Sequence, residues 1–146
     1  PTSPSLAKID QPVLYRSVYL PVTRDNVTRS MEVFDFAESS MVIGVRETSN
    51  TPDQGLYFLN NQFVIQQADK MAARLIKEES QTKDQIKLAF LLAFGRRANS
   101  TELRAAESFY RNFETSRTRF GPSSNVQKLS ALCQGILASA EFRFVN

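Results

Sequence analysis

Apolar residues recur at helical spacing along the second half of this chain. Between Val64 and Ile76 they fall three and four residues apart, which predicts an amphipathic helix ending near Glu78. This helix is predicted to begin at Thr51 and Pro52, and two adjacent asparagines, Asn60 and Asn61, could break it midway. The predicted buried stripe consists of Val64, Ile65, Ala68, Met71, Ala72, Leu75 and Ile76.

Four segments begin with a shared helix-start pattern, in which a polar capping residue precedes a glutamine or glutamate by three positions. Such a pair can satisfy free backbone N–H groups of a first turn reciprocally, as in a capping box. At the first of these starts Pro52 takes the first helical position, where its missing N–H costs nothing. The pairs are Thr51 and Gln54, Thr82 and Gln85, Asn99 and Glu102, and Ser124 and Gln127.

The segment from Ile86 to Phe94 is apolar on almost every side, which predicts a central, buried helix. Gly95 follows it and suits a left-handed C-cap, and Gly121 and Pro122 separate the last two helices. Core stripes of those two helices are predicted at Leu103, Ala106, Tyr110 and Phe113, and at Leu129, Leu132, Cys133, Ile136, Leu137 and Ala140.

The first 50 residues carry weaker signals. The β-branched and aromatic run Tyr15 to Val22 predicts an extended edge segment, and Thr28 to Phe34 a short helix. A brief strand is predicted over Met41 to Val45. The C-terminal "EFRFVN" alternates with period two and could pair with the segment 15–22.

These patterns predict a mainly α fold: a compact bundle of about four to five helices with an irregular N-terminal segment and one or two short extended strands. A chain of 146 residues suits a single domain with its own core. Residues 1–14 are expected to be a flexible linker or an artificial chain end. Residues 15–146 are expected to be one helical C-terminal domain of a larger protein.

The amino-acid composition limits the kinds of catalytic and metal-binding site that the chain can form. The chain has no His and a single Cys, which removes the commonest general base, the usual transition-metal ligand and every His-dependent triad. We therefore predict no catalytic, cofactor-binding or metal-binding residues, and Cys133 is interpreted as a small apolar core residue. No apolar run could span a bilayer, and the N-terminus lacks the pattern of a signal peptide, so an export signal would belong to a longer precursor.

Two acidic residues form the only speculative site. Glu32 and Asp35 are three residues apart, and a carboxylate pair can perform acid and base chemistry if burial separates the two pKa values. The structural alternative, which we favour, is that they are surface acids or partners of Arg46.

A basic region follows Gly95, and with the aromatic rings of Tyr110 and Phe113 it superficially suits a nucleic acid. Helical spacing favours another interpretation, in which the arginines lie on the solvated face and Glu107 pairs with Arg111. Nucleic-acid binding is therefore kept only as a second alternative. The basic residues are Arg96, Arg97, Arg104, Arg111, Arg117 and Arg119.

Four separated stretches resemble one known family. They are "RSVYLPV", "FDFAESSMVIGVRETSNTPDQGLYFLNNQFVIQQADKMAARL", "IKLAFLLAFGRRANSTEL" and "LCQGILASAEFRFVN". In this order they resemble the C-terminal domain of planctomycete-type cytochrome-associated proteins, domain of unknown function 1553, also called PSD1. The motif positions of this resemblance are Arg46, Thr51, Pro52, Gln54, Leu59 and Asn60, which we interpret as structural; Gly55 departs from it, because relatives carry Ala there.

The resemblance implies where the domain lies in its parent protein and where that protein is located. Members occupy the end of large exported bacterial proteins that carry a c-type haem domain further upstream. Haem c is therefore expected only in upstream domains, because covalent attachment needs a Cys-x-x-Cys-His motif. The expected location is periplasmic or extracellular.

The chain is expected to act as a non-catalytic accessory or interaction domain. Its expected partners are the upstream domains of its own polypeptide, and glycans or other proteins are further candidates. The alternative is that it contributes residues to a catalytic or carbohydrate-binding site completed by those domains.

Overall fold

A computed structural model describes residues 17–19, 28–36, 44, 49, 51–115 and 124–144. The described part is mainly helical, as predicted, and contains no strand. The chain divides into two compact units, Pro1–Tyr57 and Phe58–Asn146, which are described in turn. No helix in the described ranges has both the length and the apolar character that a membrane crossing requires.

The described residues of the first unit form two short elements and the start of a longer helix. These are η2 (Ser17–Tyr19), α1 (Arg29–Val33) and the first residues of α2 (Pro52–Asn60). The α1 helix confirms the helix predicted over 28–34, and Phe34 after it stacks edge-on against Tyr57 at 5.5 Å. The extended segment predicted over 15–22 is wrong at Ser17–Tyr19, which form a 3₁₀ turn. An edge strand needs a neighbouring strand to bond, and the predicted partner is itself helical.

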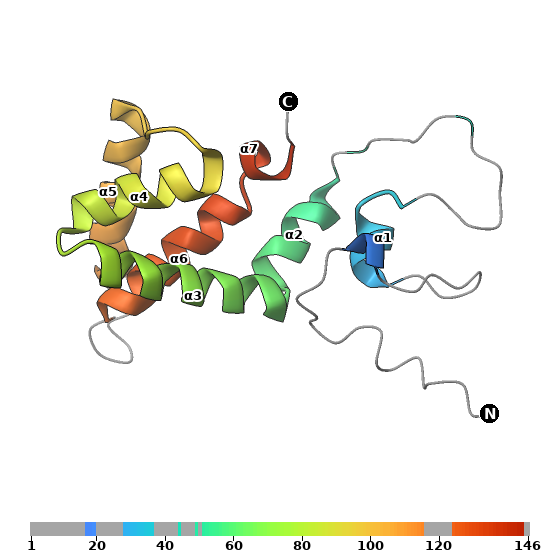
Figure 1. Ribbon diagram of the computed structural model, residues 1–146, viewed down its shortest axis with the longest axis horizontal. Helices are drawn as coiled ribbons and strands as arrows, with labels where there is room; N and C mark the ends of the chain where they lie inside the picture. Colours follow the sequence, from blue (N-terminus) through green and yellow to red (C-terminus); the bar gives the residue numbers. More distant parts are fainter. Residues whose placement is uncertain are drawn as a thin grey trace. The chain divides into compact units, whose positions relative to one another are not determined.

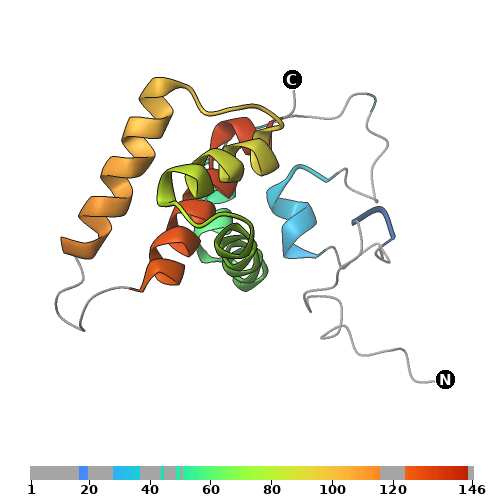
Figure 2. The same ribbon diagram turned by 60° about the vertical axis from the view of Figure 1, so that its left-hand side comes forward.

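The second unit is a bundle of helices (Figure 1). Beyond the end of α2 it contains α3 (Gln62–Glu78), α4 (Thr82–Phe94), α5 (Ser100–Thr115), α6 (Asn125–Leu137) and α7 (Ala140–Arg143). The longest contact runs between α3 and α6; α4 packs on α3, α5 and α6, and α5 lies beside α6 (Figure 2). The buried core consists of Ala68, Ala72, Leu75, Ile86, Ala89, Phe90, Ala106, Leu129, Leu132, Cys133 and Ile136.

The predicted break at the two asparagines is confirmed, because α2 ends at Asn60 and α3 begins at Gln62. Asn61 caps α3, its side chain accepting hydrogen bonds from the backbone of Phe63 (2.9 Å) and Val64 (3.4 Å). From α6, the Gln134 amide donates to the Leu59 carbonyl oxygen at 2.8 Å. The break is therefore fixed by a local cap and by a contact distant in sequence.

Two of the four predicted capping boxes are confirmed. Asn99 accepts from the backbone of Thr101 and Glu102 (both 2.9 Å), while Glu102 accepts from the Asn99 backbone at 2.7 Å. Ser124 and Gln127 form the same reciprocal pair. Gly95 ends α4 with φ 68°, the predicted left-handed cap.

The other two glutamines bond differently. Gln85 is buried and donates to the Glu79 carbonyl oxygen at 2.7 Å, while Gln81, one residue before the predicted Thr82, is the N-cap of α4. Gln54, also buried, donates to the Ser49 carbonyl oxygen at 3.1 Å. A buried amide needs a strong acceptor, and a nearby backbone carbonyl supplies one in each case.

The prediction of a central, buried helix is only partly correct for α4, which packs against α3, α5, α6 and α7. Ile86, Ala89 and Phe90 lie in the core, but Leu91 and Leu92 are 47% and 38% exposed. Neighbouring helices bury only the side chains that they cover, and composition does not reveal which positions of a helix they leave open.

The predicted C-terminal alternating segment is also wrong, because Ala140–Arg143 form α7. Ser139 caps this helix by accepting from the Phe142 backbone at 3.3 Å, and the Phe142 ring lies edge-on to Phe58 at 6.3 Å.

Ala140, predicted to be core, is exposed on α7. The stripes of α3 and α6 are otherwise buried or half-buried as predicted, and Leu103, Ala106 and Tyr110 face the core from α5. The predictions at 41–45, other than Gly44, and at Gly121 and Pro122 lie outside the described residues.

Candidate functional site

The predicted acidic site lies in the first unit, and one of its members is held by a hydrogen-bond network. Asp35 adopts a left-handed backbone (φ 54°) just after α1. Its carboxylate accepts hydrogen bonds from the Ser49 backbone and hydroxyl, each at 2.8 Å. Gln54 donates to the same hydroxyl at 3.3 Å. Asp35 therefore joins the end of α1 to the residues that precede α2.

Glu32 occupies an exposed position on α1, and Arg46 lies outside the described residues. Of the motif positions, Pro52 takes the first position of α2, the Thr51 carbonyl oxygen accepts from the Gln54 backbone, and Asn60 ends the helix. Leu59 is half exposed. These positions surround the ends of α2, and their structural role stays a prediction.

A cluster that sequence reasoning missed lies where α4, α5 and α7 meet. Arg96 forms a bidentate pair with Glu102 (2.6 and 2.9 Å) and a second one with Glu141 (2.6 and 2.7 Å). The hydrogen bonds that Arg96 donates lower the pKa of Glu102 to about 2 and also lower the pKa of Glu141, and the same bonds raise the pKa of Arg96. One guanidinium bonds two carboxylates, so this cluster ties the end of α4 to α5 and α7.

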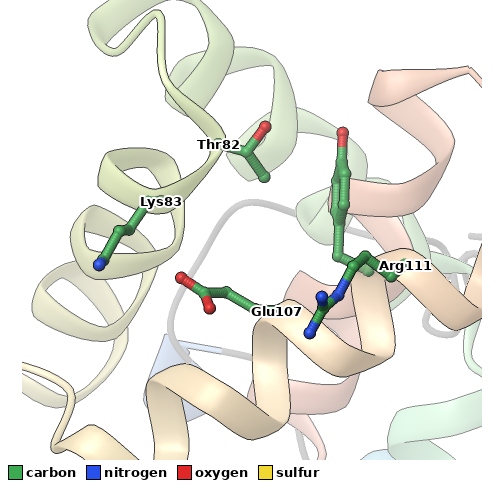
Figure 3. A pocket seen from close by; sticks show the side chains of 5 residues that line it. Thr82, Lys83, Glu107 and Arg111 are labelled. Carbon is green, nitrogen blue, oxygen red and sulfur yellow. The ribbon is translucent and has the colours of Figure 1, made fainter.

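A hollow of about 300 Å³ lies between the first turn of α4 and the middle of α5. Thr82 and Lys83 line it from α4, and Glu107, Tyr110 and Arg111 line it from α5 (Figure 3). Positions 107 and 111 lie one turn apart on α5 and so share a face. The hollow brings together two cations, a carboxylate, a hydroxyl and an aromatic ring.

The charged groups of the hollow are not paired with one another. In the described part of the chain, Lys83, Glu107 and Arg111 form no ion pair and no side-chain hydrogen bond, so the predicted pair between Glu107 and Arg111 is wrong. Other helical neighbours do pair: Arg74 with Glu78, and Lys87 with Asp84, both at 2.7 Å. The charges of the hollow therefore remain available to a ligand or partner.

The aromatic wall of the hollow is fixed in place. The Tyr110 hydroxyl donates to the Asn125 side chain on α6. The Lys128 ammonium lies over the Tyr110 ring, 5.1 Å from its centre. Contacts from α6 therefore hold the ring in one orientation, which reduces the entropy lost when a ligand packs against it.

No group of three or more metal-ligating side chains occurs among the described residues. What the hollow offers is electrostatic recognition with one apolar wall. No sequence motif indicates it, because its residues belong to two helices and their shared spacing is typical of any solvated helix face.

The fold and its surface define a small helical domain with a donor-rich hollow and a half-exposed apolar face on α4. A family model described as a protein of unknown function, DUF1553 or PSD1, matches residues 4–110, which is more than half of the chain. The chain belongs to this family. The match ends within α5, so α6 and α7 lie beyond it. No curated protein and no solved structure matches the chain significantly.

Proposed function

We propose that the chain is a non-catalytic accessory domain that docks onto upstream domains of a longer, exported, multi-domain cytochrome-c-type protein. The observation that carries this proposal is the outer face of α4. Leu91 and Leu92 are 47% and 38% exposed there, although the opposite face of the same helix lies in the core. A helix that is apolar on both faces is typical of a helix packed between two bodies.

The choice of partner rests on the family resemblance, in which such domains end large exported proteins that carry a c-type haem domain upstream. An interface within one chain needs only a modest apolar patch, because the two sides are already held at high effective concentration. Two adjacent leucines can supply the centre of such an interface, with polar residues around them. The exported location and the haem-bearing neighbour are part of the proposal.

The test is isothermal titration calorimetry between this chain and the upstream portion of its parent protein, produced separately. The wild-type chain is expected to bind, and Leu91→Ser to weaken binding about tenfold, since burying one leucine contributes about 1.5–3 kcal/mol. Val126→Ser is the matched control, because Val126 lies on α6 and is also 47% exposed. Equal losses for the two variants, or no binding to a folded upstream portion, would count against docking through α4.

A further inference from the structure

We propose that the hollow between α4 and α5 receives one carboxylate of an acidic segment in the docking partner. This inference rests on the proposed function and adds the chemistry of the partner. The hollow is defined by Thr82, Lys83, Glu107, Tyr110 and Arg111. Its volume of about 300 Å³ is at the small end of the range for ligand pockets, about 300–1,000 Å³, so it suits a side chain better than a bulky cofactor.

The charges of the hollow favour a monoanion. Lys83 and Arg111 contribute two positive charges and Glu107 one negative charge, which leaves one positive charge without a counterpart. A single carboxylate would make the set neutral, whereas a doubly charged phosphate would add a negative charge beside Glu107. A guanidinium also matches a carboxylate in shape and can donate two parallel hydrogen bonds to it.

The pairing of other side chains strengthens this argument. The chain matches Lys87 with Asp84, one turn beyond the hollow, yet leaves Lys83 unpaired in the described part. The Tyr110 ring provides an apolar wall for the methylene groups of an aspartate or glutamate, and it is already oriented by Lys128 and Asn125. A carboxylate that enters the hollow can therefore bind Lys83 and Arg111 without first breaking an ion pair within the described part of the chain.

The charge of the whole second unit is complementary to an acidic partner. Between residues 58 and 146 the sequence has 13 lysines and arginines against eight aspartates and glutamates, a net charge of +5. An excess of this size attracts acidic surfaces over a distance of about one Debye length, roughly 8–10 Å. The hollow gives this general attraction a specific point of attachment.

The experiment measures fluorescence anisotropy of a labelled oligoglutamate peptide titrated with the full chain at low salt. An oligoglutamine peptide of equal length is the reference probe, and it is expected not to bind. The double variant Lys83→Gln with Arg111→Gln should weaken oligoglutamate binding at least tenfold. Glu107→Gln should tighten it about twofold or more, because it removes a competing carboxylate.

The matched control is Lys70→Gln with Arg104→Gln, which removes the same net charge from exposed positions on α3 and α5 outside the hollow. It should change affinity less than about threefold. An equal loss in this control would overturn the proposal in favour of diffuse attraction, and weaker binding by Glu107→Gln would overturn the role assigned to the hollow. Circular dichroism melts check that each variant folds.

The inference and the proposed function can fail separately. If the upstream portion binds in calorimetry and oligoglutamate does not bind, docking stands and the carboxylate site is wrong. If oligoglutamate binds through the hollow and the upstream portion does not bind, the acidic partner is a different protein and docking within the parent protein is wrong.

Discussion

Replacing Leu91 with Ala should cost the isolated chain little stability, whereas replacing Leu75 with Ala should cost it a great deal. Leu75 is fully buried where α3 faces the core, so its truncation removes apolar contacts and leaves a cavity. Changes of this kind destabilise proteins by about 2–5 kcal/mol. Leu91 is 47% exposed, so about half of its surface is already in water. If full burial of a leucine contributes about 2 kcal/mol, the loss at Leu91 is about 1 kcal/mol or less.

The assay is urea denaturation followed by circular dichroism, with the free energy of unfolding obtained by linear extrapolation. Leu75→Ala should lower the midpoint strongly and Leu91→Ala only slightly, with similar slopes. If the two variants lose equal stability, Leu91 is part of the core of the isolated chain. That result would refute the outward orientation on which the docking face depends.

Three further predictions concern helix ends and charge. Asn99→Ala should lower the free energy of unfolding by about 1 kcal/mol because it removes the acceptor for two backbone N–H groups, while Asn99→Ser, a good cap, should restore most of it; equal losses in urea denaturation would exclude a capping role. Gly95→Ala should cost about 1 kcal/mol because of the left-handed φ of 68°, although the site has open space for a methyl group; a rise in midpoint would contradict this. The pKa of Glu102 is lowered to about 2 from 4.5, so its contribution should be complete above pH 4.5 and disappear as the pH falls towards 2. Glu102→Gln should flatten the pH dependence of the melting temperature in that window, and an unchanged slope would argue against the pair with Arg96.

Local signals predicted the helices well. The stripe of α3 and the reciprocal pairs that begin α5 and α6 depend on residues within one or two turns, so the sequence contains all the interactions that decide them. The break at Asn61 belongs to the same class, because its side chain accepts from the backbone of Phe63 and Val64, two and three residues further on.

Non-local contacts account for most of the wrong predictions. The sequence predicts a central, buried α4, but the exposure of Leu91 depends on which positions of α4 the neighbouring helices cover. The period-two pattern of the last residues was outweighed by the Ser139 cap and by the contact between Phe142 and Phe58. Local alternation over so few residues is a weak signal when a tertiary contact competes with it.

The candidate site was the hardest part to predict. Arg96 meets Glu141 from a separation of 45 residues, and no spacing rule links two positions so far apart. The hollow depends on how α4 and α5 pack, which sets Lys83 opposite Glu107. Glu107 and Arg111 have the spacing of a helical ion pair, but an ion pair at the surface gains little over the solvation of its two charges, so the spacing permits a pair without requiring it.

Hydroxyl-radical footprinting, read by mass spectrometry, is the most direct test of the central claim that α4 docks onto upstream domains. The oxidation rates of Leu91 and Leu92 would be compared between the isolated chain and the full-length parent protein, with Phe109 on α5, 40% exposed, as the internal reference. Docking through α4 predicts that both leucines become protected several-fold in the parent protein, while Phe109 reacts at an unchanged rate. Equal oxidation of Leu91 and Leu92 in the two proteins would contradict it.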